Sequence, residues 1–322
     1  MLSREDLEYR AKLWNEIINS IRQFFAARGY TEVRVPLVVR SPGMEPNLNP
    51  IGVDLQTLTS THRAWLITSP EYSMKKLLAA GMQKIYTIPQ VFRNIEKLGE
   101  RWSIEFTMLE WYQQQADYRA CMDETEALVN SILGGDEAWP RISYIETFKD
   151  RFGFYPHEVT WELIREVASK YNLDISKCDT VASAVADIFQ WQVMPDLEKE
   201  HARFFLIDYP VAEAALAQKN LDGRSAQRFE GYVNGLEICN GFTELVDPVE
   251  QRARFVAEAE ERRAAGKEVF PVDEELLTGL ASIASPTFGN ALGIDRLVML
   301  KAGVKEIDAI HLFPPSRRFT NG

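Results

Sequence analysis

Long apolar runs are missing from this 322-residue sequence: none approaches the roughly 20 residues that a membrane-spanning helix needs. The N-terminal stretch MLSREDLEYR also lacks the apolar segment of a secretory signal. Cysteine is scarce, and Cys121, Cys178 and Cys239 are too scattered for a disulfide framework or a zinc site. We therefore expect a cytoplasmic protein in which each cysteine is a small buried hydrophobe.

A lysine-rich tract and an excess of basic residues are missing too. Acidic residues outnumber basic ones by 47 to 36, which gives a net charge of −11 at pH 7. Proteins that bind a nucleic acid along its length usually present a strongly basic face. The charge therefore disfavours extensive nucleic-acid binding and favours a basic protein partner.

The spacing of apolar residues predicts a mixed α and β chain, long enough for one large domain or two ordinary ones. An amphipathic helix should end near Arg28-Gly29, and Asp247-Pro248 has the features of a helix N-terminus. Further predicted elements are a short strand at 32–36, an irregular segment at 41–63, helices from 68 and over 118–133, a helical insertion or covering layer over 134–200, and a buried strand at 203–208.

Residues 91–112 read as a strand, a charged loop and a second strand. Four side chains of the second strand share one face because strand side chains alternate: Phe106, Met108, Glu110 and Tyr112. Both faces carry large apolar groups, so we expect the strand to be covered on both sides, and a buried Glu110 must pair or bind a cation. Arg93 and Glu110 could then hold opposite ends of a zwitterion, although Glu110 could also pair with an Arg in the core.

Asn234-Gly235 lies between two strand-like runs and is a strong hairpin signal. A two-residue turn there makes Tyr232 face Glu237 and Glu230 face Cys239, so both carboxylates line one surface. Carboxylates at this spacing suit Mg²⁺ bound to phosphates. The alternative is a solvated face with unpaired acids.

The run from Phe288 to Leu300 places Gly289 and Gly293 before a predicted helix with Arg296 in its first turn. Helix N-termini favour anions, and Arg296 adds a planar group for phosphate or adenine. Close packing of a helix on a sheet is the alternative explanation for the two glycines.

In this order, the segments resemble the three motifs of class II aminoacyl-tRNA synthetases, and more closely those of the lysyl-tRNA synthetase-like family. Gly29 to Pro36 resembles motif 1, Phe92 to Phe106 motif 2, and Gly289 to Leu300 motif 3. The resemblance covers nearly the whole chain. It implies an α+β fold, with an antiparallel sheet flanked by helices, and a homodimer formed through motif 1.

Motif 1 begins within the first thirty residues, so we expect a single catalytic domain over residues 1–322 without an anticodon-binding domain. That truncation, with the run Leu109-Glu110-Trp111-Tyr112, resembles the branch of the family that modifies elongation factor P. The resemblance implies that lysine or an isomer such as β-lysine is activated by ATP and Mg²⁺ as an adenylate and passed to a lysine of that factor. Alternatives are transfer to tRNA or a small acceptor, and a regulator that binds an amino acid without turnover.

The resemblance also implies roles for individual residues. Arg93 and Arg296 would be catalytic, and Glu230 and Glu237 would bind Mg²⁺. ATP contacts would come from Arg93, Asn94, Glu96, Arg101, Ser103, Phe106, Glu237, Ile238, Gly293 and Arg296. Substrate contacts would come from Ser69, Pro70, Glu71, Glu110, Tyr112, Cys239, Asn240 and Glu244.

Four features need separate interpretation. Glu71 could instead be a capping-box acid that closes back on Thr68. The motif 2 loop ends Trp102-Ser103-Ile104-Glu105-Phe106, where the family usually has His-Asn-Pro-Glu-Phe. Cys239 stands where the family has glycine or alanine, which predicts a changed fit for lysine isomers. For Asn240 to reach the ligand face, the hairpin also needs a bulge near Gly241.

Overall fold

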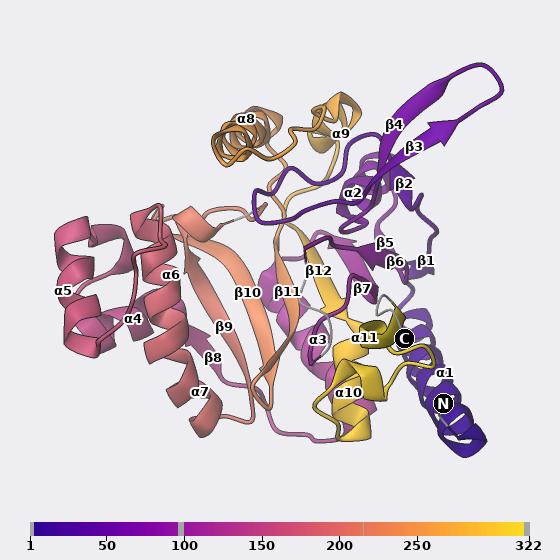
Figure 1. Ribbon diagram of the computed structural model, residues 1–322, viewed down its shortest axis with the longest axis horizontal. Coiled ribbons are helices and arrows are strands. Elements are labelled where there is room, and N and C mark those ends of the chain that lie inside the picture. The colour runs from indigo at the N-terminus through magenta and orange to yellow at the C-terminus, as the bar shows by residue number, and fades with distance from the viewer. Residues whose placement is uncertain (1–2, 96–99, 215, 319–322) are drawn as a thin grey trace. The chain divides into compact units, whose positions relative to one another are not determined.

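The computed structural model describes residues 3–95, 100–214 and 216–318 (Figure 1). By its internal contacts the chain divides into two compact units. The first unit combines Met1–Asp136 with Leu245–Gly322, and the second is Glu137–Glu244. Each unit builds a mostly antiparallel sheet flanked by helices, which confirms the predicted α+β class.

The first unit contains a sheet centred on β7. Its strands, in order, are β1 (Thr31–Glu32), β5 (Lys84–Thr87), β7 (Glu105–Gln114) and β12 (Thr287–Gly293), with β6 (Gln90–Phe92) paired to the start of β7. Of these strand pairs, β1–β5 is parallel, and β5–β7, β7–β12 and β6–β7 are antiparallel. A separate antiparallel sheet contains β2 (Val38–Val39), β4 (Thr61–Leu66) and β3 (Gly52–Gln56), and Figure 1 shows its β3–β4 hairpin projecting from this unit.

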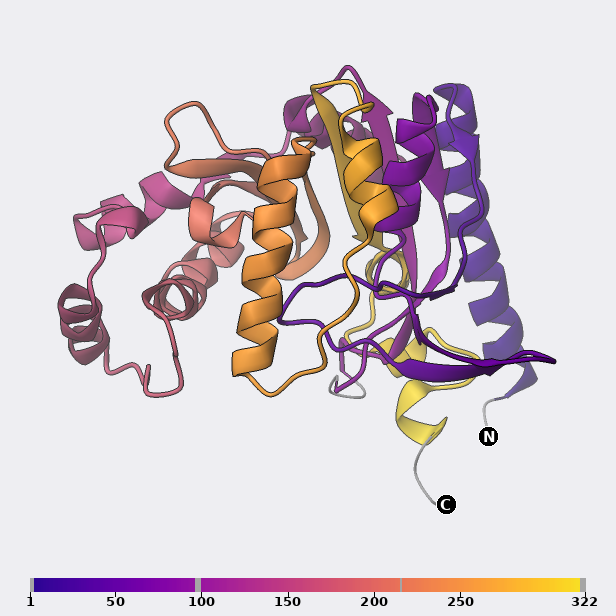
Figure 2. The ribbon, with the colours of Figure 1, turned by 90° about the horizontal axis from the view of Figure 1, so that it is seen from above.

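The first unit's helices pack around its strands, and Figures 1 and 2 show α1 (Arg4–Ala27) running alongside the main sheet. The helices are α1, α2 (Glu71–Ala79), α3 (Tyr118–Leu133), α8 (Pro248–Ala264), α9 (Glu274–Leu280), α10 (Ile294–Ala302) and α11 (Pro315–Arg318). Phe25 of α1 stacks on Tyr86 with ring centroids 4.7 Å apart and meets Trp111 of β7 edge-on at 5.5 Å. The predicted helices at 118–133 and after Asp247 are confirmed, whereas the strand predicted at 32–36 is only the two-residue β1.

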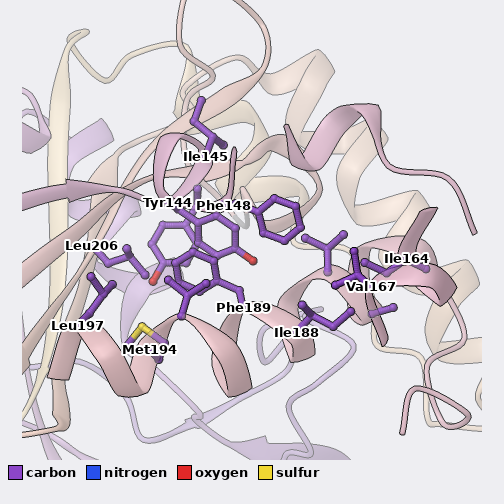
Figure 3. Packing of buried hydrophobic residues seen from close by; sticks show 14 of the residues in the cluster. Tyr144, Ile145, Phe148, Ile164, Val167, Ile188, Phe189, Met194, Leu197 and Leu206 are labelled. Atoms are coloured by element: carbon purple, nitrogen blue, oxygen red, sulfur yellow. The ribbon is translucent and has the colours of Figure 1, made fainter. Parts of the chain in front are cut away.

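The second unit builds its sheet in the order β8 (Arg141–Ser143), β9 (Arg203–Pro210), β10 (Ser225–Val233) and β11 (Leu236–Thr243). Its helices are α4 (Tyr144–Phe152), α5 (Trp161–Tyr171), α6 (Val181–Gln192) and α7 (Met194–Glu200), so the helical content predicted for 134–200 is present. These helices enclose an apolar core in which Tyr144 stacks on Phe189 at 3.7 Å, with Ile164 and Ile188 nearby (Figure 3).

The β10–β11 hairpin turns at Asn234 and Gly235, whose φ angles of 50° and 69° are those of a two-residue type I′ turn. Tyr232 pairs with Glu237 as predicted. Beyond that pair Ile238 is an extra residue in β11, so Gly231 pairs with Cys239, and Glu230 pairs with Asn240. The prediction that Glu230 faces Cys239 is therefore wrong.

None of the helices in the described ranges combines the length and the apolar character that crossing a membrane requires.

Candidate active site

A buried carboxylate on β7 is the centre of the first unit's candidate site. Glu110 is 2% exposed, and β7 is buried on both sides from Thr107 to Tyr112, as its sequence predicts. One carboxylate oxygen, Oε1, accepts a hydrogen bond from Ser69 Oγ at 2.7 Å, and Oε2 accepts one from the Tyr112 hydroxyl at 2.9 Å. The fold thus brings together three of the predicted substrate-binding residues: Glu110 and Tyr112 of β7, and Ser69, which lies 41 residues before Glu110 in the sequence.

The electrostatic environment of Glu110 favours a cation. Burial raises the pKa of its carboxyl to about 8, and the negative charge of Glu71 adds to this effect. Hydrogen bonds from Ser69 and Tyr112 and the charge of Arg93 lower the pKa, but less strongly. A positive group bound beside Glu110 would stabilise its ionised form.

The turn before α2 places Glu71 close to this carboxylate. Pro70 precedes the helix, Ser69 Oγ accepts a hydrogen bond from the Glu71 N–H at 3.0 Å, and Lys75 Nζ lies 2.6 Å from Glu71 Oε1. Lys75 is 1% exposed, so this ion pair is buried, and its two residues lie one helical turn apart. The capping-box alternative for Glu71 is not observed: the residue at the N-cap is Pro70, and the Glu71 carboxylate binds Lys75.

Arg93 follows β6 and is held next to β7. Its N–H donates to the carbonyl of Ile104 at 2.8 Å, and its guanidinium carbon lies 5.2 Å from the centre of the Phe106 ring. The charge of Arg93 also lowers the pKa of both Glu110 and Glu45. Its guanidinium therefore acts on the same region as the buried acids.

The loop after Arg93 is described in part. Asn94 donates its N–H to the Asn49 carbonyl at 2.7 Å, whereas Glu96 lies outside the described residues. Ser103 is buried and its Oγ accepts a hydrogen bond from the Glu105 N–H at 3.3 Å, while Arg101 is exposed.

Helix α10 is joined to β7 by its first turn. Asp295 is buried, and its Oδ2 accepts a hydrogen bond from the Thr107 N–H at 2.7 Å. The guanidinium carbon of Arg296 lies 4.9 Å from the centre of the Trp102 ring. A Cβ on Gly293 would make only ordinary contact with Arg296, at 3.6 Å, so this contact does not itself require a glycine.

In the second unit, one face of the β10–β11 hairpin carries a polar network. Arg228 Nη2 lies 2.6 Å from Glu230 Oε1, the Tyr232 hydroxyl donates to Glu230 Oε2 at 2.7 Å, and Arg228 Nε donates to Asn240 Oδ1 at 3.2 Å. The bulge at Ile238 therefore brings Asn240 onto the face of Glu230, Tyr232 and Glu237. A bulge was predicted for this purpose, but near Gly241.

Cys239 lies on the opposite face of the same hairpin. It is 2% exposed and pairs with Gly231, where a Cβ would come within 2.7 Å of its Sγ. Gly231 thus leaves room for a packed thiol. The expectation that Cys239 shares the surface of Glu230 is wrong, because the bulge reverses the alternation after Glu237. Glu244 follows β11 and is 1% exposed.

The fit of Mg²⁺ can be judged from Glu230 and Glu237. Among the described residues, no group of three or more His, Cys, Asp or Glu side chains is arranged to hold a metal. Both oxygens of Glu230 already have partners, Arg228 and Tyr232. Mg²⁺ commonly binds through one or two carboxylates together with substrate phosphates and water. The hairpin face fits an ion brought by a phosphate ligand, and not one held by protein alone.

Sequence reasoning missed three charged residues. Arg228 was not selected because a single Arg in a strand carries no motif, although its alternation with Glu230 and Tyr232 was visible. Glu45 lies in a segment assigned only as irregular, and Glu258 lies in the middle of α8. The Oε2 atoms of Glu45 and Glu258 are buried and make no hydrogen bond among the described residues.

Comparison with known proteins gives the family. The model for class II tRNA synthetases (D, K and N) matches residues 1–317, and the chain belongs to this family. It is 36% identical over 307 residues to the elongation factor P–(R)-β-lysine ligase of Proteus mirabilis (strain HI4320), with 94% of each chain covered. The protein of the same name from Vibrio cholerae is 37% identical over 320 residues, covering 97% of this chain and 96% of its own length.

Glu110 should make the stability of the ligand-free protein depend on pH. Its folded pKa of about 8 lies above the ordinary 4.5, so the folded state retains a proton that the unfolded state releases. The free energy of unfolding should therefore fall as pH rises through this interval. Urea unfolding at pH 5.5 and 8.0 should show a smaller pH effect in Glu110→Gln than in the wild type or in the exposed control Glu137→Gln. An equal pH effect in all three proteins would contradict the raised pKa.

Proposed function

We propose that this protein uses ATP to activate lysine or a lysine isomer such as β-lysine and transfers the acyl group to a lysine side chain of elongation factor P. Membership of the class II family and the names of full-length relatives support the reaction. The structural observation that carries the proposal is the buried carboxylate of Glu110. Ser69 and Tyr112 orient this carboxylate by hydrogen bonds, and the charge of Glu71 destabilises its ionised form. Such a group is suited to a terminal ammonium.

The proposed roles divide between amino acid and nucleotide. In the first unit, Arg93 holds the substrate carboxylate and the α-phosphate, and Glu110 with Tyr112 receives the side-chain ammonium. Ser69, Pro70 and Glu71 bind the other amino group. ATP contacts are proposed for Asn94, Glu96, Arg101, Ser103, Phe106, Ile238, Gly293 and Arg296. Asn240 and Glu244 are also proposed to bind the substrate.

No protein nucleophile is needed for this reaction. The substrate carboxylate attacks the α-phosphorus of ATP and pyrophosphate leaves; the acceptor amine then takes the acyl group and AMP leaves. Arg93 and Arg296 position the reactants and stabilise developing charge. Glu230 and Glu237 would hold Mg²⁺, which neutralises phosphate charge when ATP is bound.

Replacement of Glu110 tests the ammonium pocket. Glu110→Gln keeps the shape and a hydrogen-bonding group but removes the charge. Loss of one partner of a buried pair costs about 3–5 kcal/mol, so kcat/KM for lysine in ATP–pyrophosphate exchange should fall at least about 100-fold. The KM for ATP should change little. Unaltered lysine kinetics would exclude Glu110 from the pocket.

The acceptor is tested by mass spectrometry of intact products. The protein is incubated with ATP, Mg²⁺ and α- or β-lysine, together with elongation factor P or tRNA. We expect elongation factor P to gain one lysyl residue and tRNA to remain uncharged, with Arg93→Ala inactive in both reactions. Charging of tRNA without modification of elongation factor P would show that tRNA is the acceptor. Absence of pyrophosphate exchange with every isomer would favour a non-catalytic regulator.

We also propose a twofold homodimer formed through residues 24–36, the motif 1 region. An exposed apolar run begins at the end of this region with Pro36 and continues through Leu37, which is 39% exposed, and Val38, which is 36% exposed. Light scattering at micromolar concentration should give twice the 36.8 kDa of one chain, and Leu37→Asp should shift the mass toward one chain. A wild-type mass of one chain would contradict the dimer.

A further inference from the structure

The loop that carries Glu45 is fixed to helix α8. Arg262 is 2% exposed, and its Nη1 donates to the carbonyls of Glu45 at 3.0 Å and Leu48 at 2.9 Å. Lys267 Nζ donates to the Pro46 carbonyl at 2.6 Å. Glu258 lies on α8 one turn before Arg262. These contacts hold the loop of Glu45 against the helix that carries Glu258, although the two residues are distant in the sequence.

The side chains of Glu45 and Glu258 gather around Tyr72. The Tyr72 hydroxyl accepts a hydrogen bond from the Met44 N–H at 3.3 Å, and its ring centre lies 5.6 Å from that of Phe255 on α8. Burial raises the pKa of Tyr72, and the charges of Glu45, Glu258 and Glu71 raise it further. The phenol therefore lies among three carboxylates.

The carboxyl groups also change one another's pKa values. Burial raises the pKa of Glu258 to about 8, with further increases from Glu45 and Glu71. Burial, followed by the charge of Glu71, raises the pKa of Glu45. Arg254 lowers the pKa of Glu258, and Lys75 lowers that of Glu45 but is paired with Glu71.

A small cavity lies against Glu45. Its volume is about 20 Å³, and its lining includes Glu45, Ser69, Glu71 and Tyr72. A space of this size holds roughly one water molecule, which is also the size of an ammonium group. Glu45 Oε2 packs so closely on Gly43 that a Cβ there would collide with it. Glycine at position 43 thus lets the carboxylate occupy its position.

We propose that Glu45 is a further substrate-binding residue, which together with Glu71 binds the amino group next to the reacting carboxyl of the lysine-type substrate. This proposal rests on the function proposed above, the activation of an amino acid by ATP. Arg93, the proposed ligand of the carboxylate, acts on Glu45 as well as on Glu110, so groups for both ends of an amino acid lie in one region. Glu258 is not among the residues that line the cavity.

The direct test pairs a substitution with a substrate that lacks one amino group. In calorimetric titrations without ATP, Glu45→Gln should weaken lysine binding about 10- to 100-fold, the effect of a hydrogen bond to a charged group. The same variant should bind 6-aminohexanoate, which lacks the amino group next to the carboxyl, as the wild type does. Glu45→Asp should restore part of the lysine affinity, and the exposed Glu260→Gln serves as the control.

Two outcomes separate this role from a structural one. Because Glu45→Gln removes a repelling charge, its thermal midpoint should equal or exceed that of the wild type. Equal losses of affinity for lysine and 6-aminohexanoate, or a marked loss of stability, would overturn the proposal. Lysine binding that depends on Glu45 without pyrophosphate exchange would instead reject the proposed activation while retaining the binding residue.

Discussion

A cluster of buried carboxyl groups is the constraint on which the first unit depends. Glu110 is almost fully buried, and Glu71 and Glu45 act on the same region, where Lys75 and Arg93 are nearby positive groups. Carboxylates held in this way destabilise the empty protein, so their geometry must be imposed by the rest of the fold. Hydrogen bonds from Ser69 and Tyr112, the buried Lys75 and the Arg262 contacts to the loop provide that support. The arrangement is understandable when a ligand supplies the missing positive charge.

A different constraint operates in the second unit, where one extra residue decides which side chains share a face. With Ile238 bulged, Asn240 joins Glu230 on the polar face, while Cys239 turns toward Gly231. Arg228 then links Asn240 to Glu230. Arg228 and Tyr232 together occupy both carboxylate oxygens of Glu230.

Local sequence signals predicted the parts of the fold that local physics determines. Alternation placed Glu110 on a doubly covered strand, and Asn234-Gly235 determined the turn and its first two pairs. The position of the bulge at Ile238 could not be predicted from the sequence, because it depends on how the two strands pair farther from the turn. Glu45 could not be predicted for a similar reason: the loop that carries it is held by Arg262, which is 217 residues away in the sequence.

Proton release during ligand binding tests the central claim most directly. At pH 7 the Glu110 carboxyl, with a pKa of about 8, is largely protonated in the empty protein, and an arriving ammonium should expel that proton. Calorimetry of lysine binding in two buffers of different ionisation enthalpy measures the number of protons released. The account predicts net release in the wild type and less in Glu110→Gln. Binding with no proton release, or with the same release in both proteins, would contradict it.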